Sequence, residues 1–117
     1  LLDPNVALYL LGGRLAMPLP AGTYGVSVIT EMELLAWPSL TAKEKKVREF
    51  LQQLVVCELT PPIRARAVEL RRVHQLKLPD AVVCATALEF GVALWTNDKT
   101  LAKVSGLNCR AVGLTMS

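Results

Sequence analysis

The stretch LLDPNV at residues 1–6 places an acid between two leucines and the start of a helix. The leucines are expected to end a first β-strand. Asp3 can then cap the helix that follows, and Pro4 suits its first position, where no amide hydrogen is needed. We expect this helix to continue to Leu11 and to stop at the glycines that follow. An acid at the point where a strand gives way to a helix is the pattern from which the fold prediction is built.

Three further acids lie near expected starts of helices or ends of strands. They are Glu33 after the strand 24–28, Asp80 in the first turn of the helix 78–90, and Asp98 after the strand 93–96. In a right-handed βαβ layout, the carboxyl ends of strands and the amino ends of helices meet at one edge of the sheet. We therefore expect all four acids to converge there, where carboxylates repel one another and attract a divalent cation. Asp80 reaches this edge only if the preceding helix returns the chain to it.

The rest of the chain also alternates strands with helices. We expect further strands at 55–59 and 109–114, helices at 30–37, 41–54 and from 61 onward, and a short helix at 99–104. Thr30 with Glu33, and Thr41 with Glu44, are interpreted as capping boxes. This alternation predicts a three-layer α/β/α fold around a mostly parallel sheet of about five strands. At 117 residues, the chain is long enough for one domain, residues 1–117, and not for two.

The composition limits the class of protein. Hydrophobic residues make up 52% of the chain, yet the longest apolar run, residues 81–88, is too short to cross a membrane. The surplus of apolar residues favours contact with a partner, either a second copy or another protein. Cys57, Cys84 and Cys109 show no metal-binding spacing and lie in apolar stretches. Reduced thiols in a cytoplasmic protein are therefore expected.

The charge balance suits a polyanionic partner. The net charge is +3, and the surface outside an acidic pocket would be more basic than this total. Arg14 and Lys99 follow segments near the proposed pocket, so each is a candidate contact for a phosphate group. His74 lies beside two arginines near a helix end and is interpreted as structural. Trp37, at the end of an expected helix, is a candidate contact for a protein partner.

Taken alone, each acid has a structural explanation. Asp3 and Asp98 can serve as N-caps. Asp80 is favoured in the first turn of its helix by the helix dipole, and Glu33 is explained by its capping box. These separate explanations do not account for the sequence motifs that surround all four acids.

The amino-acid sequence around the four acids resembles the successive motifs of VapC-type PIN-domain toxins. The resemblance covers essentially the whole chain, in order and at ordinary intervals. The residues that carry it are LLDPNV at 1–6, SVITEMELL at 27–35, LPDA at 78–81 with ATAL at 85–88, and WTNDK at 95–99.

This resemblance implies a metal-dependent endoribonuclease from a type II toxin–antitoxin pair. The family's catalytic and metal-holding acids map onto Asp3, Glu33, Asp80 and Asp98. Glu33 is the match because it directly precedes the two leucines of its motif. Glu31 would point about 200° away on a helix. Asp3 and Asp98, at adjacent strand ends, are the expected direct ligands.

The resemblance also implies supporting residues, a cofactor and partners. The polar residues of the motifs map onto Asn5 and Thr96, which are expected to orient the carboxylates by hydrogen bonds. Pro4 departs from the family, which usually has threonine or serine there. The implied cofactor is Mg²⁺ or Mn²⁺, which would activate a water for in-line attack on an RNA phosphodiester. The implied partners are RNA, a VapB-type antitoxin and a second copy in a homodimer.

Other classes of protein fit the sequence less well. A catalytically inactive PIN-like module that binds RNA or protein is the main alternative, although all four acids are present. A phosphoacceptor receiver domain would need an acid pair after its first strand and a lysine after its fifth, whereas this chain has Asp3 alone and nothing basic after Val112. A flap nuclease of the same superfamily would be longer.

Overall fold

The computed structural model describes residues 1–36 and 43–115. Its helices are α1 (Pro4–Leu11), α2 (Val28–Ala36), α3 (Glu44–Gln52), α4 (Pro61–His74), α5 (Leu78–Phe90) and the short 3₁₀ helix η2 (Leu101–Lys103). Its strands are β1 (Gly25–Ser27), β2 (Val55–Cys57), β3 (Leu94–Trp95) and β4 (Cys109–Arg110). No helix in these ranges is long and apolar enough to span a membrane.

The sheet consists of two parallel pairs joined by the first residues of the chain. β1 pairs with β2, and β3 pairs with β4. Between the two pairs, the Leu2 amide donates to the Gly25 carbonyl at 2.8 Å, and the Trp95 amide donates to the Leu1 carbonyl at 2.8 Å. The Asp3 amide adds a bond to the Trp95 carbonyl at 3.0 Å. Five parallel segments therefore follow one another in the order β2, β1, residues 1–2, β3 and β4, which agrees with the predicted fold class.

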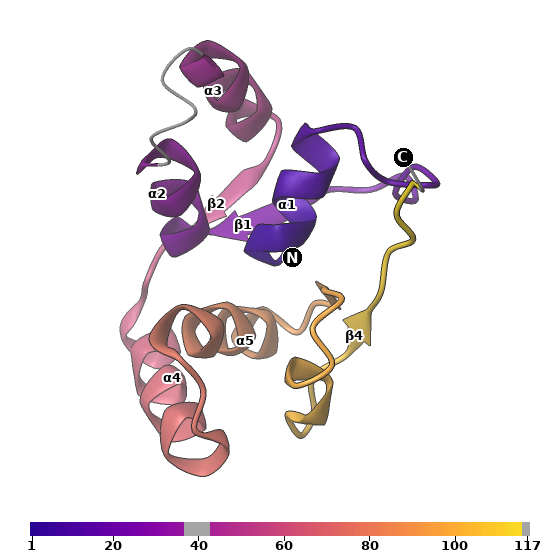
Figure 1. The fold of residues 1–117 in the computed structure, drawn as a ribbon. Coiled ribbons are helices and arrows are strands. Elements are labelled where there is room, and N and C mark those ends of the chain that lie inside the picture. Colours follow the sequence, from indigo (N-terminus) through magenta and orange to yellow (C-terminus); the bar gives the residue numbers. More distant parts are fainter. Residues whose placement is uncertain (37–42, 116–117) are drawn as a thin grey trace.

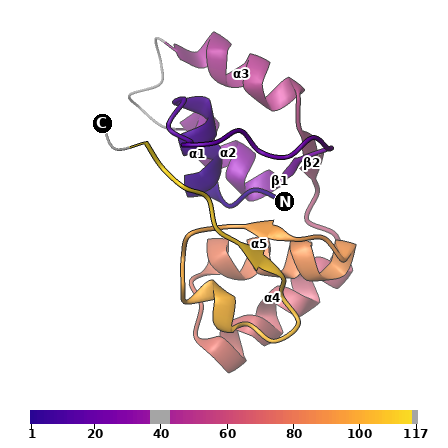
Figure 2. The same cartoon turned by 90° about the vertical axis from the view of Figure 1, so that its right-hand side faces the viewer.

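Helices cover both faces of this sheet. Figures 1 and 2 show α1, α2 and α3 on one side of the strands and α4 and α5 on the other. Leu1 packs into the core under α4 and α5, and Leu2 packs into the core under α1, α2 and α3. The two neighbours separate because successive side chains of a strand point to opposite faces. One dipeptide thus contributes to two cores.

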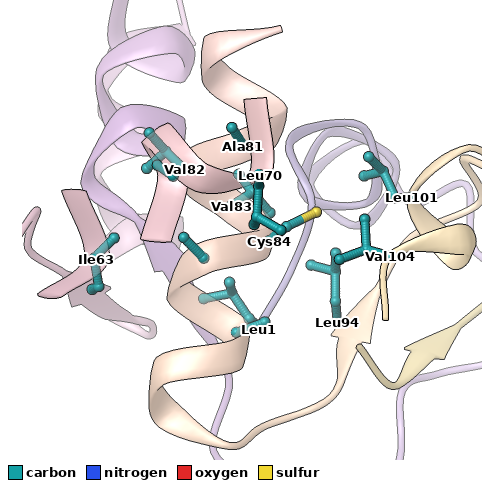
Figure 3. Packing of buried hydrophobic residues seen from close by; sticks show 13 residues of the cluster. Leu1, Ile63, Leu70, Ala81, Val82, Val83, Cys84, Leu94, Leu101 and Val104 are labelled. Atoms are coloured by element: carbon teal, nitrogen blue, oxygen red, sulfur yellow. The ribbon is translucent and has the colours of Figure 1, made fainter. Parts of the chain in front are cut away.

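The core under α4 and α5 is drawn in Figure 3, where Leu1, Leu94 and Cys84 converge from different elements. Every residue of α5 from Ala81 to Ala87 is buried. This helix shows no polar face there because it lies between the sheet and α4 and is surrounded by apolar neighbours. Its apolar run is long enough for that burial and too short for a membrane.

The α4–α5 hairpin brings Asp80 to its place. α4 ends at His74, and Gln75 has the left-handed backbone conformation, with φ 56°, that turns the chain sharply. α5 begins three residues later, and Gly91 ends it in the same conformation. α4 therefore supplies the return that the sequence analysis required for Asp80.

Some predicted boundaries were wrong. The strands are shorter than expected, and the helix at 99–104 is only the 3₁₀ turn η2. α2 begins at Val28 rather than at Thr30, because the Ser27 hydroxyl accepts a hydrogen bond from the Ile29 amide and opens the helix earlier. Thr30 lies inside α2, so its capping box with Glu33 was a wrong interpretation. Trp37, and Thr41 of the second capping box, lie outside the described residues.

Gly25 stands where β1 approaches β2 most closely. A Cβ atom at Gly25 would lie 2.9 Å from the Val55 carbonyl oxygen, whereas one at Gly113 would meet its nearest neighbour at an ordinary 3.5 Å. We expect Gly25→Ala to lower the free energy of unfolding by about 1–3 kcal/mol, because the sheet must shift. Gly113→Ala should change it by less than about 1 kcal/mol. Urea unfolding of both variants measures the difference, and equal effects would contradict the close approach.

Candidate active site

Asp3 is the most firmly held of the predicted site residues. Its side chain is buried at the end of the central strand, and its Oδ1 accepts hydrogen bonds from the amides of Asn5 at 2.6 Å and Val6 at 3.4 Å. Its Oδ2 accepts a bond from the buried Thr96 hydroxyl at 2.5 Å. The N-cap role and the site role therefore coincide, because capping fixes the carboxylate at the carboxyl edge of the sheet.

Thr96 joins Asp3 to the loop that carries Asp98. The Thr96 hydroxyl donates to Asp3 and accepts from the Asp98 amide at 3.0 Å. Thr96 thus makes a hydrogen bond to a carboxylate as expected, and its supporting role at a metal site stays a prediction. Asn5 contributes through its backbone amide, while its side chain is exposed.

Asp98 is exposed and is oriented by Thr100. The Thr100 hydroxyl and amide both donate to Asp98 Oδ1, at 2.6 Å and 2.9 Å. These bonds favour the charged form, and they hold the pKa of Asp98 below its ordinary value. Asp98 is therefore an ionised carboxylate fixed at the mouth of the site.

The pKa of Asp80 depends on the other two aspartates. Asp80 is half-buried in the first turn of α5, and burial is the main cause that raises its pKa. The negative charges of Asp98 and then Asp3 raise it further. Lys77 acts in the opposite direction. Acids that stand at positions 3, 80 and 98 of the chain thus share one electrostatic environment.

Glu33 differs from Asp3 in its exposure. It is exposed on α2. Among the described residues, the acids whose charges raise the pKa of Asp80 are Asp98 and Asp3, and Glu33 is not one of them. Glu31 is half-buried and lines a hollow beside α3 with Leu35 and Arg48. The two glutamates therefore face different surroundings, as their angular separation on a helix predicts.

The donor chemistry fits a hard divalent cation, although the ligand set is incomplete as the side chains stand. Within residues 1–36 and 43–115, no group of three or more acid, histidine or cysteine side chains is gathered closely enough to hold a metal ion. Carboxylate oxygens are the preferred ligands of Mg²⁺ and Mn²⁺, and the repulsion that raises the pKa of Asp80 is what a cation would relieve.

The two predicted phosphate contacts differ in their surroundings. Lys99 is exposed directly after Asp98. Arg14 is exposed too, but its guanidinium carbon lies 5.3 Å from the centre of the Tyr9 ring at the end of α1. This cation–π contact gives Arg14 a local structural partner.

Sequence reasoning missed three residues near the site. Thr100 orients Asp98, and an Asx-type turn in the sequence TNDKT would have indicated it. Lys77 influences Asp80, which only the α4–α5 turn reveals. Cys84 lies beneath the site, where burial, then Cys109 and then the aspartates raise its pKa to about 12. A neutral thiol there adds no further negative charge.

Comparison with known proteins identifies the family of the chain. The PIN domain family model matches residues 1–107. A chain from a toxin–antitoxin complex of Klebsiella pneumoniae is 31% identical, with 91% of this chain and 92% of that chain covered and a TM-score of 0.77. No curated protein matches the chain.

Two more distant structures share the fold. VapBC2 from Rickettsia felis, bound to a DNA fragment from its promoter, is 15% identical over 95% of this chain and 96% of that chain, with a TM-score of 0.76. DNA-bound VapBC from Salmonella typhimurium is 18% identical over 94% and 95%, also with a TM-score of 0.76. The resemblance to VapC-type toxins that the sequence indicated is confirmed, and the chain belongs to the PIN domain family.

Proposed function

We propose that this protein is a metal-dependent endoribonuclease that acts as the toxin of a toxin–antitoxin pair. The observation that carries the proposal is the shared electrostatic environment of Asp3, Asp80 and Asp98. The negative charges of Asp98 and Asp3 disfavour the charged form of Asp80, and a bound cation would relieve that repulsion. Such an arrangement is typical of a site for phosphoryl chemistry.

The residues divide into fixed and adjustable groups. Asp3, held by two amides and Thr96, and Asp98, held by Thr100, are the fixed carboxylates and the direct ligands that we propose. Asp80 and Glu33 are the adjustable groups, which hold the cation or a water that it binds. Bound Mg²⁺ or Mn²⁺ supplies a water of lowered pKa and neutralises charge on the scissile phosphate.

RNA is the substrate class that we propose. The acids occupy one edge of a chain whose net charge is still +3, so positive charge is concentrated elsewhere on the surface. Lys99 follows Asp98 directly, and the charge of Lys77 lowers the pKa of Asp80, which supports both as phosphate contacts beside the acids. Phosphate contacts of this kind position a nucleic acid without reading its sequence.

An antitoxin of VapB type is the protein partner that we propose. The 31% identical Klebsiella chain comes from a toxin–antitoxin complex, and this chain exposes large apolar side chains that suit protein contacts. A homodimer and a cytoplasmic location, where thiols stay reduced, complete the proposal. Cys57, Cys84 and Cys109 are indeed free thiols.

The alternative is a catalytically inactive PIN-like module that binds RNA or protein. The incomplete ligand set in the described residues favours this alternative more than the sequence did. Its distinguishing property is the lack of divalent-cation binding at millimolar concentration.

We expect Asp3→Asn and Asp98→Asn each to reduce Mg²⁺- or Mn²⁺-dependent RNA cleavage by roughly 100-fold or more, because each removes a charged ligand. Asparagine can keep the cap bonds at position 3 and the turn bonds at position 98. Its NH2 group cannot accept the bond from the buried Thr96 hydroxyl, so Asp3→Asn should unfold at a lower temperature, whereas Asp98→Asn should unfold close to the wild type. Circular dichroism should show both variants folded. Cleavage of a fluorescent RNA, with and without a chelator, measures the loss.

The matched control is Glu69→Gln, an exposed acid on α4. It removes one negative charge outside the site and should leave cleavage unchanged. If Asp98→Asn cleaves as fast as Glu69→Gln, the assignment of the site is wrong.

The raised pKa of Asp80 gives a pH test on metal-free protein. The folded state binds this proton more tightly than the unfolded chain, so the resulting stability is present below the ordinary pKa and is lost as the pH rises through the raised value. Asp98→Asn removes one of the charges that raise the pKa and should lower it. Titration of the Asp80 carboxyl carbon by NMR measures the change. An unchanged pKa would show that the two acids do not interact.

The biological role is tested in cells. Expression of the chain alone should arrest growth, and co-expression of its neighbouring antitoxin gene should restore it. The Asp98→Asn variant should not arrest growth. Arrest by that variant would indicate toxicity without catalysis, as the inactive-module alternative predicts.

A further inference from the structure

One buried hydroxyl beside the acidic edge lacks a hydrogen-bond partner. Thr30 lies in the first turn of α2 and has no exposed surface. Within the part of the chain that the structure describes, its Oγ1 is a buried side-chain oxygen without any hydrogen bond. A hydroxyl that has left water without gaining a partner destabilises the folded state. An acceptor that approaches this hydroxyl in another state of the protein would remove that cost.

Thr86 shows why position matters. It is buried in the middle of α5, and its hydroxyl donates to the Val82 carbonyl four residues earlier at 2.7 Å. The residue four before Thr30 is Val26, which belongs to strand β1. The helical carbonyl that a mid-helix threonine uses is therefore missing at Thr30.

Thr30 lies at the same edge as the carboxylates. The Leu2 amide donates to the Gly25 carbonyl, which aligns residues 1–2 with strand β1. Asp3 comes directly after residues 1–2, and α2 comes directly after β1, so Asp3 and the start of α2 lie at the same end of the sheet. α2 packs against α1, which Asp3 caps, and against α5, which carries Asp80. Thr30, within the first turn of α2, is therefore placed close to this edge.

Glu33 is the acid of α2 that lies one helical turn after Thr30. It follows Thr30 by three residues, which places it one turn along and about 60° around the helix. Side chains at this spacing can reach each other. Glu33 is exposed, and it is not among the causes that raise the pKa of Asp80.

We propose that Thr30 is a positioning residue for Glu33: when a divalent cation binds, the Glu33 carboxylate turns inward and accepts a hydrogen bond from Thr30 Oγ1. This inference rests on the proposed function. A single rotation of the Glu33 side chain would account for two observations. The Thr30 hydroxyl, which has no partner among the described residues, would gain an acceptor, and the exposed Glu33 would join the three aspartates around the cation. The cation offsets the cost of bringing the carboxylate inward, which explains why Glu33 faces solvent without it.

Thr30→Val tests the proposal, because valine keeps the shape of threonine and removes the hydroxyl. Without metal, Thr30→Val should unfold at the same temperature as the wild type or higher, since an unpartnered hydroxyl is lost. Thr86→Val, the matched control, should unfold at a lower temperature, since it loses a satisfied bond. With metal, the apparent Kd for Mn²⁺, measured from the rise in Tm, should increase roughly 10-fold in Thr30→Val. Thr30→Ser should bind Mn²⁺ as the wild type does.

A double-mutant cycle assigns the acceptor. In a Glu33→Ala background, Thr30→Val should cause no further loss of Mn²⁺ affinity, because the hydroxyl has no carboxylate to hold. The proposal is overturned if Thr30→Val binds Mn²⁺ like the wild type, if it unfolds early like Thr86→Val, or if its loss persists in that background. If the wild type itself gains no stability from Mn²⁺ or Mg²⁺, the proposed function fails, and this inference fails with it.

Discussion

The hydrogen bonds made by the first three residues hold this structure together. β1 with β2, and β3 with β4, would otherwise be separate two-stranded pairs, and isolated pairs of that size are marginal in water. Leu1 and Leu2 join them and send one side chain into each core. Asp3 follows at once, so the same segment that closes the sheet also positions the central carboxylate. The same short segment thus joins the sheet and carries the proposed ligand Asp3.

Asp3, Asp80 and Asp98 interact although their negative charges repel one another. Asp3 and Asp98 are held by hydroxyl and amide donors, which favour their charged forms. Burial, and then the charges of Asp98 and Asp3, raise the pKa of Asp80. A bound cation would relieve the part of this shift that comes from charge repulsion. The threonines that hold the fixed acids are as much a part of the site as the acids themselves.

The sequence predicted the order and type of the helices and strands better than the residues at which they begin and end. The order of strands and helices, the cap at Asp3 and the stop at Gly91 follow from local rules, since caps, glycines and apolar periodicity act over a few residues. The starting point of α2 was missed because Thr30 and Glu33 satisfy the capping-box pattern while Ser27, one turn earlier, opens the helix. Strand lengths were overestimated because they depend on pairing with distant segments.

For the site, the sequence by itself determined which residues are acids and which end of each element they occupy. It could name Asp3, Glu33, Asp80 and Asp98, because an acid next to a helix start is a local pattern. Only the tertiary structure decided which of them interact. The α4–α5 hairpin carries Asp80 back to the others, and the α2 helix leaves Glu33 in solvent, because long-range packing sets the distances between side chains far apart in sequence.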